Sequence, residues 1–566
     1  MTSMFNRNSR EPTPSSLPTA IPQKRILEDE NRPPISSPLN PDIKPKTEPS
    51  DAPLTKERAS RAKKESLKKR ESKVGSLAPD ITSARATPDV KTVSHKIKKQ
   101  KEALAPTRYQ LPPPRATDFE VPRGPVFTPA FVKAGIDEND VQFHETSDHV
   151  YNKKGFHYTH CIADPTFPST IYYRQTETEP FEARLNFEDT STHMFLDDAG
   201  HHITTDKGWR MAKANVGVRE GRWYWECRIT SGIPRRNKDE GESSNGHVRI
   251  GWARREATLD APVGFDAYSY GLRDVAGQKV FMSRPKDFFV KGDDIREGDV
   301  IGLEINLPSE TLHRKIVEGH YNKAVDFKDE GNHIFDVAPI IRDRVPIRFK
   351  THLYFEQIDY QTTKELEELM NPSPVISSTG GVGASGEEPD PSHTYPSLRT
   401  LPHSSITIYK NGVEMGTAFE NILAFLPPAS KPIVTVGSRD GLDDGMLGYY
   451  PAISVFRGGA AQVNFGPKFW FPPEGMAEGD VVMADSGLPS TSSLHKIRPV
   501  SERYDEQIVE DIVYDILDEV DWWMRDGGVS GKVVTYSGPR PEYSAQNGMA
   551  GGVEGSEIKE LVQDDD

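Results

Sequence analysis

The amino-acid sequence predicts a mostly β protein, in which antiparallel strands form a sandwich followed by one amphipathic helix. Three observations carry this prediction. Short segments alternate apolar and polar residues, an Asn-Gly pair joins two of them, and no predicted strand is followed by a helical crossover. Parallel strands need such crossovers, so the sheets are expected to be antiparallel and to pack face to face.

The predicted strands lie in residues 206–475, which we expect to form one domain. The strongest are residues 222–230 (RWYWECRIT), 247–254 (HVRIGWAR), 299–307 (DVIGLEINL), 405–409 (SITIY) and 452–457 (AISVFR). Asn411 and Gly412 lie between two alternating runs within residues 406–419. This pair predicts a two-residue hairpin with a type I′ turn.

Residues 1–118 are expected to form a disordered basic arm, because Pro, Ser, Lys, Glu and Thr dominate and no hydrophobic period is sustained. Residues 56–70 carry eight basic residues against two glutamates, and residues 96–101 form a second basic cluster. Such runs suit nuclear import or weak contact with DNA, and equally a solvated tail of no specific use. The whole chain carries a net charge of −15. A dedicated nucleic-acid binder is therefore not expected.

The remaining segments differ in composition. Residues 119–205 read as an extension that precedes the main domain. Inside the domain, residues 371–400 are rich in Pro, Ser and Gly and are expected to be a disordered insertion. Residues 312–348 form a longer, partly apolar insertion whose structure the sequence does not determine. Residues 476–502 read as a linker, and residues 526–566 as a disordered tail.

Residues 503–525 are expected to form the amphipathic helix, which Gly527 and Gly528 would end. Its apolar stripe follows helical spacing and consists of Val509, Ile512, Val513, Ile516 and Val520, widened by Leu517. Burying five such side chains is worth about 7–15 kcal/mol before ordering costs. The stripe could pack on the chain's own core or bind a partner. The opposite face is acidic, which disfavours a membrane surface.

The sequence offers no catalytic residues, cofactor site or metal site, and no enzyme activity is expected. Only Cys161 and Cys227 are cysteines, and Cys161 with His157 and His160 lacks a fourth ligand at suitable spacing. Three glycines in the spacing GxGxxG lie in the Pro-rich insertion, where no strand and helix flank them. No apolar run approaches the roughly 18 residues that a membrane span needs, so we expect a soluble, intracellular protein without membrane contact.

Six motifs in the expected order resemble a SPRY domain, and among SPRY domains those of the Ash-two family, whose fungal members are called Bre-two. They are KGWRMAKANVGVREGRWYWE (207–226), GHVRIGWAR (246–254), DAPVGFDAYSYGLRD (260–274), EGDVIGLEINLP (297–308), YKNGVEMGTAF (409–419) and NFGPKFWFPP (464–473). The terminal helix also resembles the Dpy-thirty-binding motif of that family. Together these matches cover about half of the chain.

The resemblance implies a non-enzymatic scaffold and activator subunit of COMPASS, the nuclear complex that methylates lysine 4 of histone H3 in chromatin. It implies that the SPRY domain binds an acidic segment of a WD40 propeller subunit of the Swd-one or retinoblastoma-binding type. It also implies activation of a SET-domain methyltransferase, and binding of a Dpy-thirty-type dimer by the helix. The basic arm could then touch nucleosomal DNA weakly.

The family's basic pocket maps onto Arg249, Pro262, Phe265 and Arg273, where Phe265 replaces the expected tyrosine. Alternation along residues 247–254 independently puts Arg249 on the face opposite the apolar side chains. Two neighbouring arginines would suit carboxylates or a phosphoryl group. The alternative is that both pair with acids of their own sheet.

A second function remains open from the sequence, namely a SPRY adaptor that recognises peptides for a ubiquitin ligase. Such adaptors normally carry a RING finger or an elongin-binding box. Neither is visible in a chain with two cysteines.

Overall fold

The computed structural model describes residues 114–132, 141–152, 155–164, 173–235, 246–326, 340–372, 374–376, 382–384, 388–433, 441–476, 496–526 and 558–561. The basic clusters of the expected arm lie outside the described residues. So do residues 477–495 of the expected linker and residues 527–557 of the expected tail.

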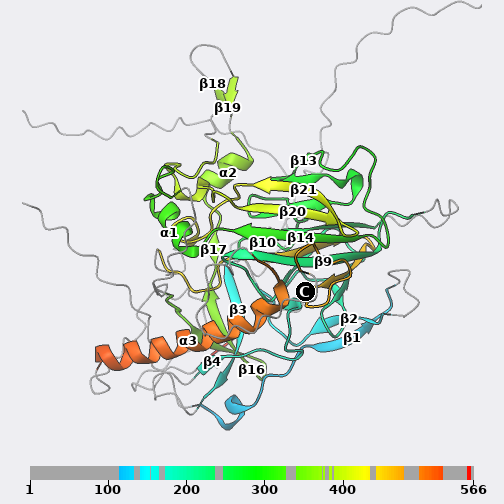
Figure 1. Ribbon diagram of the computed structural model, residues 1–566. Helices are drawn as coiled ribbons and strands as arrows, with labels where there is room; N and C mark the ends of the chain where they lie inside the picture. The colour runs from blue at the N-terminus through cyan, green and yellow to red at the C-terminus, as the bar shows by residue number, and fades with distance from the viewer. Residues whose placement is uncertain are drawn as a thin grey trace, which may run out of the picture. The chain divides into compact units, whose positions relative to one another are not determined.

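Two large antiparallel sheets face each other and form a sandwich (Figure 1). The first runs in the order β1 (Val126–Ala130), β2 (Phe143–Ser147), β6 (Phe195–Leu196), β7 (His202–Thr204), β24 (Ala460–Asn464), β9 (Gly221–Ser231), β14 (Val300–Leu307), β20 (Ser405–Lys410), β21 (Val413–Glu420). The second runs in the order β13 (Arg284–Lys286), β12 (Lys279–Phe281), β11 (Ser269–Arg273), β10 (His247–Arg254), β23 (Tyr449–Phe456), β8 (Arg210–Ala214), β5 (Leu185–Thr190). The mostly β, antiparallel prediction is confirmed.

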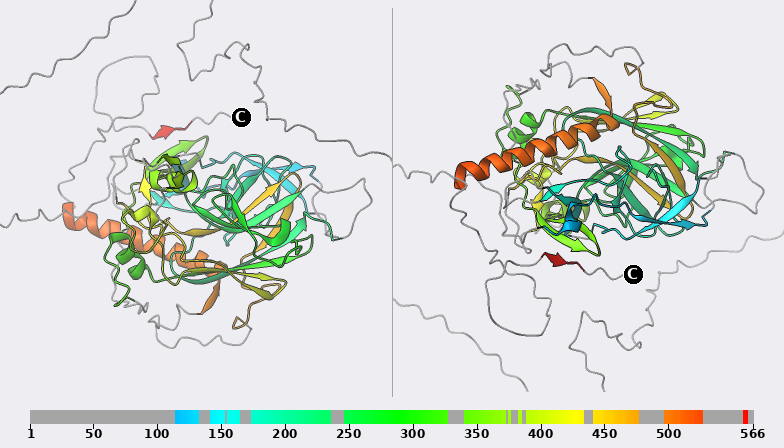
Figure 2. Two further views of the ribbon diagram at one scale, coloured as in Figure 1. Left: turned by 90° about the horizontal axis from the view of Figure 1, so that it is seen from above. Right: turned by 90° about the horizontal axis from the view of Figure 1, so that it is seen from below.

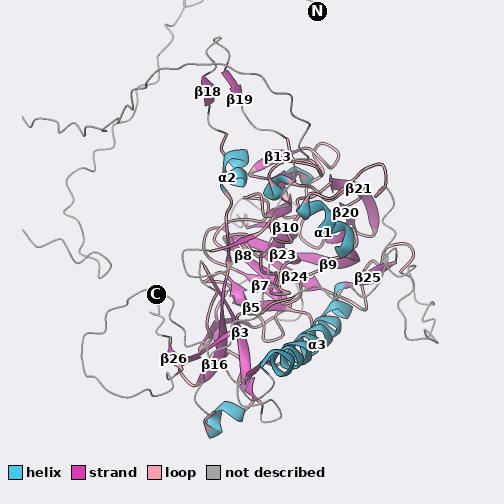
Figure 3. Cartoon of the chain, turned by 90° about the vertical axis from the view of Figure 1, so that its left-hand side faces the viewer, coloured by secondary structure: helices cyan, strands magenta, loops and turns pink. Residues whose placement is uncertain are grey.

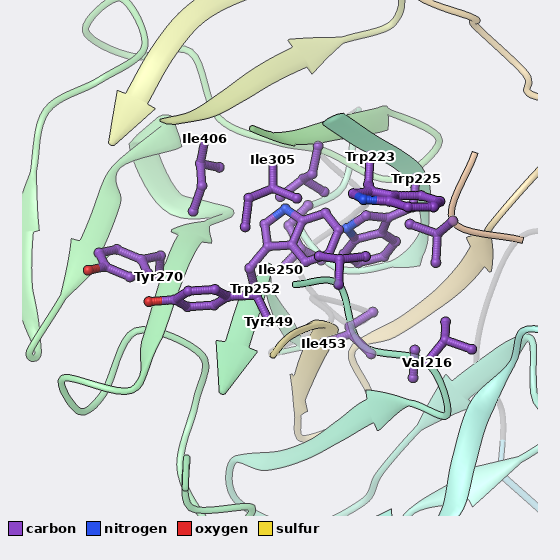
Figure 4. Packing of buried hydrophobic residues seen from close by; sticks show 14 of the residues in the cluster. Val216, Trp223, Trp225, Ile250, Trp252, Tyr270, Ile305, Ile406, Tyr449 and Ile453 are labelled. Atoms are coloured by element: carbon purple, nitrogen blue, oxygen red, sulfur yellow. The ribbon is translucent and has the colours of Figure 1, made fainter. Parts of the chain in front are cut away.

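The core lies between these two sheets, and tryptophans occupy its centre (Figure 4). Trp225 of β9 and Trp252 of β10 are completely buried and meet edge to face, with ring centroids 6.3 Å apart. Aromatic pairs favour this geometry because the positive ring edge meets the negative ring face. Alternation along each strand supplies the surrounding aliphatic side chains, which explains why the strand predictions place these elements correctly.

The predicted hairpin is β20 joined to β21, and its turn has the predicted type. Asn411 has φ of 50° and Gly412 has φ of 82°. A type I′ turn requires positive φ at both central residues, and Asn and Gly adopt it at the lowest cost.

The segment 464–473 covers the outer face of β9 and is held there by a buried carboxylate. Glu226 accepts hydrogen bonds from the backbone N–H groups of Trp470 (2.6 Å) and Phe471 (2.8 Å). Burial raises the pKa of Glu226, although the two N–H groups stabilise the carboxylate and so lower the pKa. One acid on the outer face of the sheet therefore fastens the end of the sandwich.

Part of the expected 312–348 insertion belongs to the main core. Helix α1 (Glu310–Glu318) begins where the side chain of Ser309 accepts a hydrogen bond from the N–H of Leu312, and it ends at Gly319 with φ of 81°. These are the usual start and stop signals of a helix. Its buried face joins the sandwich core through Leu312, Ile316 and Val317.

The structure describes parts of the expected disordered insertion at 371–400, whereas residues 377–381 and 385–387 lie outside the described residues. Helix α2 (Lys364–Met370) precedes a small hairpin of β18 (Pro374–Ile376) and β19 (Val382–Ala384). Residues 388–399 are described and packed: they contain the 3₁₀ helix η3 (Pro396–Leu398), and Leu398 lies in a second core cluster with Leu366. Buried leucines explain why this Pro- and Ser-rich stretch is ordered at its end.

A third sheet runs in the order β26 (Lys559–Glu560), β15 (Val345–Phe349), β16 (His352–Ile358), β3 (Phe156–Ala163), β4 (Tyr173–Gln175). Of the expected extension at 119–205 it holds β3 and β4, whereas β1, β2, β5, β6 and β7 belong to the two large sheets, so the extension is part of the sandwich and does not simply precede it. A short pair joins β17 (Tyr360–Gln361) to β22 (Lys431–Pro432), and a further 3₁₀ helix, η2, spans Val275–Gly277.

The third sheet corrects two predicted boundaries. Residues 114–118 of the expected disordered arm are described: the 3₁₀ helix η1 (Ala116–Phe119) carries Asp118, which is buried and pairs with Arg348 at 2.8 Å. In the expected disordered tail, β26 pairs with β15 in parallel, and Ile558 and Leu561 pack against the sheet's core clusters (Figure 3). The segment is too short to show a period in the sequence, so its pairing could not be predicted.

Helix α3 spans Val500–Asp526, so it begins three residues before and ends one residue after the predicted range of 503–525. It follows β25 (Ile497–Pro499), which pairs in parallel with β9. The last residues of the expected linker are thus structured. Val500 is completely buried, and the guanidinium of Arg503 donates a hydrogen bond to the carbonyl of Gly217 (3.0 Å). These contacts fix the start of α3 on the sandwich, and Figure 2 shows its C-terminal end reaching past the strands.

Candidate partner-binding surfaces

Arg249 and Arg273 lie directly opposite each other on the outer face of the β10 and β11 pair. Their neighbours Val248, Ile250 and Leu272 point inward and are buried. Period-2 alternation therefore puts both guanidinium groups on the same side of the sheet, as alternation predicts for Arg249 and the resemblance implies for Arg273.

Pro262 and Phe265 belong to a loop that lies on this same outer face. Gly271 permits the approach, because a Cβ atom there would lie 2.6 Å from the carbonyl oxygen of Val263. The N–H of Val263 donates to the hydroxyl of Ser454 (3.0 Å), and that hydroxyl donates to the carbonyl of Arg249 (3.4 Å).

Within the loop, the N–H of Phe265 donates to the carbonyl of Pro262 (3.0 Å) and closes a turn. Pro262 is buried, whereas the Phe265 ring is 49% exposed. The structure thus places the four predicted pocket residues on the same outer face, the two arginines on β10 and β11 and the exposed ring of Phe265 on the loop that crosses them.

Within the part of the chain that the structure describes, the arginine pair forms no ion pair with a carboxylate. This finding contradicts pairing of Arg249 and Arg273 with acids of their own sheet. The nearby Asp274 pairs instead with His247 (2.9 Å). Burial and the charge of Arg273 lower the pKa of Arg249 to about 10. Its guanidinium carbon lies 4.8 Å from the ring centroid of Trp209, which holds the group in place. An anionic partner would relieve the repulsion.

Helix α3 exposes the predicted apolar stripe. The six predicted residues are 41–59% exposed. The structure extends the stripe by Ile508 and Met524, which sequence reasoning missed although both fit the same helical face. Exposed apolar surface of this extent on one helix face is typical of a binding surface.

The acidic face of α3 is docked on the protein. Arg342 pairs with Asp511, Asp515 (2.5 Å) and Asp518 (3.6 Å), and Arg344 pairs with Asp511 (2.7 Å) and Asp515 (3.1 Å). Burial disfavours the charge of Arg344, but Asp511 and Asp515 outweigh it and raise the pKa of this guanidinium. We call these five residues the clamp.

The histidines and the cysteine that the sequence places close together have other partners in the fold. His160 pairs with Glu188 (2.8 Å), and the ring of His157 shares a hydrogen bond with Asn152 (2.8 Å). Cys161 is buried, and burial raises the pKa of its thiol. Within the described part of the chain, no group of three metal-ligating side chains comes together. Among those residues, no helix has both the length and the apolar character needed to span a bilayer.

The two facing sheets, the tryptophan core and the closing segment 464–473 define a SPRY-type β-sandwich protein. No family model matches the chain. Its sequence is 58% identical to "COMPASS component cclA" of Colletotrichum higginsianum, over 98% of each chain. It is 38% identical to "Set1 complex component ash2" of Schizosaccharomyces pombe, over 89% of this chain and 60% of that protein. The chain therefore belongs to the Ash-two/Bre-two family of COMPASS components.

More distant relatives agree with this placement. "COMPASS component BRE2" of Saccharomyces cerevisiae is 26% identical over 69% of this chain and 91% of that protein. The SPRY domain of human HERC1 overlaps 50% of this chain and 96% of that chain, with 11% identity and a TM-score of 0.23. That overlap is too weak to define the fold, which rests on the sheets themselves.

Proposed function

We propose that the chain is a non-catalytic scaffold and activator subunit of a COMPASS-type histone H3 lysine-4 methyltransferase complex in the nucleus. Membership of the family supports a place in the complex. The observation that carries the scaffold role is α3, a helix docked through its acidic face with an uncovered aliphatic stripe. A long helix that presents eight apolar side chains to solvent needs a partner to bury them.

The proposed occupant of the stripe is a Dpy-thirty-type dimer. Aliphatic side chains at i, i+3, i+4 and i+7 suit a helix that enters an apolar groove. Such a groove arises where the helices of two subunits meet.

The proposed occupant of the Arg249 and Arg273 pair is an acidic segment of the WD40 propeller subunit. Two adjacent guanidinium groups that have no carboxylate partner among the described residues can bind carboxylates or a phosphoryl group, and the exposed ring of Phe265 adds apolar surface on the same face. The ubiquitin-ligase alternative is not favoured, because the relatives named above are COMPASS and Set1 complex components.

Methylation of nucleosomes by a reconstituted complex tests this function. We expect lysine-4 methylation by the SET-domain methyltransferase, the propeller subunit and the dimer to rise when the chain is added. We expect the isolated chain to methylate nothing. Equal methylation with and without the chain would refute the activator role, and activity of the isolated chain would refute the non-catalytic role.

A further inference from the structure

The docked face of α3 is held by charge. Beyond Tyr504 this face carries Asp511, Tyr514, Asp515 and Asp518, at the spacing i, i+3, i+4 and i+7. None of these is aliphatic, and each aliphatic residue of this stretch lies on the exposed stripe. Beyond the buried start of the helix at Val500 and Tyr504, the ion pairs and the ring of Tyr514, and not aliphatic side chains, determine which side of the helix meets the domain.

The segment that carries the two arginines of the clamp is held by further contacts with the domain. The N–H of Ile341 donates to the carbonyl of Asp443 (2.8 Å), whose carboxylate pairs with Arg219 (2.6 Å). Arg344 lies over the ring of Phe355 of β16, 5.0 Å from its centroid, and donates to the side chain of Gln175 of β4 (3.1 Å). The backbone next to Arg342 is thus tied to the sandwich, and the guanidinium of Arg344 is tied to the third sheet independently of the helix.

The side chains of Arg342 and Arg344 are only 2% and 9% exposed. A buried guanidinium without its carboxylate is strongly destabilising, so rotation of α3 away from the clamp is opposed. Rotation in either direction would also bring aliphatic side chains against these charges. Since helices are marginal in water without tertiary contacts, the clamp also protects the outer turns of α3 from fraying.

We propose that Arg342 and Arg344 are positioning residues, which hold Asp511, Asp515 and Asp518 so that α3 keeps one direction and presents its aliphatic stripe to the partner. This inference rests on the proposed function, in which the stripe binds a dimer. When only a fraction of molecules presents a binding surface correctly, the apparent dissociation constant rises in inverse proportion to that fraction. The clamp therefore raises the affinity of the aliphatic stripe for the dimer by increasing the fraction of molecules that present it correctly, without contacting the dimer itself.

The distance distribution between two spin labels on the full chain tests the clamp without any partner. Labels are attached to Met524→Cys at the end of α3 and Val290→Cys on the sandwich, both largely exposed positions. The two native cysteines are buried and remain unlabelled. We expect one narrow distribution for the otherwise unchanged chain and a broad one for Arg342→Glu with Arg344→Glu.

Charge reversal on the helix provides the rescue. Adding Asp511→Arg and Asp515→Arg to the glutamate variant should restore the narrow distribution. Asp511→Asn with Asp515→Asn weakens the clamp from the helix side alone, so it remains informative if the glutamate variant fails to fold. The matched control is Lys350→Gln, which removes an exposed ion pair with Asp148 close to β15.

The same variants are then titrated with the purified Dpy-thirty-type dimer. We expect the apparent dissociation constant to rise about tenfold in both clamp variants and to recover on charge reversal. A narrow distribution and unchanged affinity in the clamp variants would overturn the inference. If the distribution is narrow in the unmodified chain and broad in the clamp variants, but the unmodified chain does not bind the dimer, the proposed function fails while the hold of the clamp on α3 is confirmed.

Discussion

Two arginine pairs on this protein have opposite environments. Arg249 and Arg273 face outward from the β10 and β11 pair without a carboxylate of the described chain. Arg342 and Arg344 are buried against three aspartates of α3. The Arg249 and Arg273 pair therefore leaves its positive charge available to an anionic partner. The Arg342 and Arg344 pair binds the acidic face of α3 and so leaves the aliphatic stripe of that helix exposed to a partner.

The comparison shows that the role of an arginine pair depends on whether the chain supplies its own anion. A buried ion cluster contributes little net stability, but it fixes geometry because every alternative leaves a charge unpaired. An uncompensated pair on a rigid sheet contributes no stability, but it favours an incoming anion. The two surfaces should therefore respond differently to substitution and salt.

The largest effect is expected at the surface that the clamp exposes. Ile512→Asp with Ile516→Asp should weaken binding of the dimer about 1,000-fold, because two buried isoleucines contribute about 1.5–3 kcal/mol each and the new carboxylates resist burial. Both positions are about half exposed in the chain alone, so its unfolding temperature should not change. Calorimetric titration and thermal unfolding measure the two quantities.

The control for that prediction is Val290→Asp with Val413→Asp, which changes exposed valines away from α3. It should bind the dimer normally. Equal loss of affinity in the control would show that added charge, and not the stripe, governs binding.

The next effect concerns the outward pair. Arg249→Ala with Arg273→Ala should weaken binding of an acidic propeller peptide at least about 100-fold, since each charge-assisted contact is worth about 1.5–3 kcal/mol. Stability should be unchanged or slightly higher, because the variant removes repulsion between like charges. Fluorescence anisotropy with the labelled peptide gives the affinity. Arg296→Ala, which breaks the partly exposed pair with Asp294, is the control. An unchanged dissociation constant in the double variant would refute the pocket.

The two arginine pairs should respond differently to ionic strength. Raising ionic strength from about 0.1 M to about 1 M shortens the Debye length from about 10 Å to about 3 Å and should weaken binding of the acidic peptide to Arg249 and Arg273 about tenfold. The clamp is buried, so the spin-label distribution of α3 should change little over the same range. A helix that detaches in salt while the peptide stays bound would reverse the assignment of the two pairs.

The smallest effect is expected from Phe265→Tyr, which adds a hydroxyl at the exposed pocket wall. One hydrogen bond contributes about 1 kcal/mol, so the acidic peptide should bind about fivefold more tightly. Phe265→Leu keeps an apolar wall without the hydroxyl and should not gain affinity. A tyrosine variant that binds no better than the native chain would show that this position does not face the peptide.

The sequence predicts those features that local periodicity specifies. Alternation in HVRIGWAR separates Arg249 from the buried face, and the spacing from Val509 to Val520 gives the stripe. The Asn411 and Gly412 turn follows from the backbone angles that these residues tolerate.

Features that depend on distant pairing could not be predicted. Arg342 contacts Asp511 across 169 residues, and no local pattern marks that ion pair. The acidic face of α3 therefore looks like a solvated face in the sequence, although the structure docks it. Likewise Leu398 and Leu561 lie in short segments whose few apolar residues show no sustained period, and tertiary packing alone buries or covers them.

Native mass spectrometry of the chain mixed with the propeller subunit and the dimer tests most directly whether two separate surfaces bind two partners. The native chain should carry both partners. Arg249→Ala with Arg273→Ala should lose only the propeller, and Ile512→Asp with Ile516→Asp should lose only the dimer. Loss of both partners in either variant, or retention of both in each, would contradict two independent surfaces.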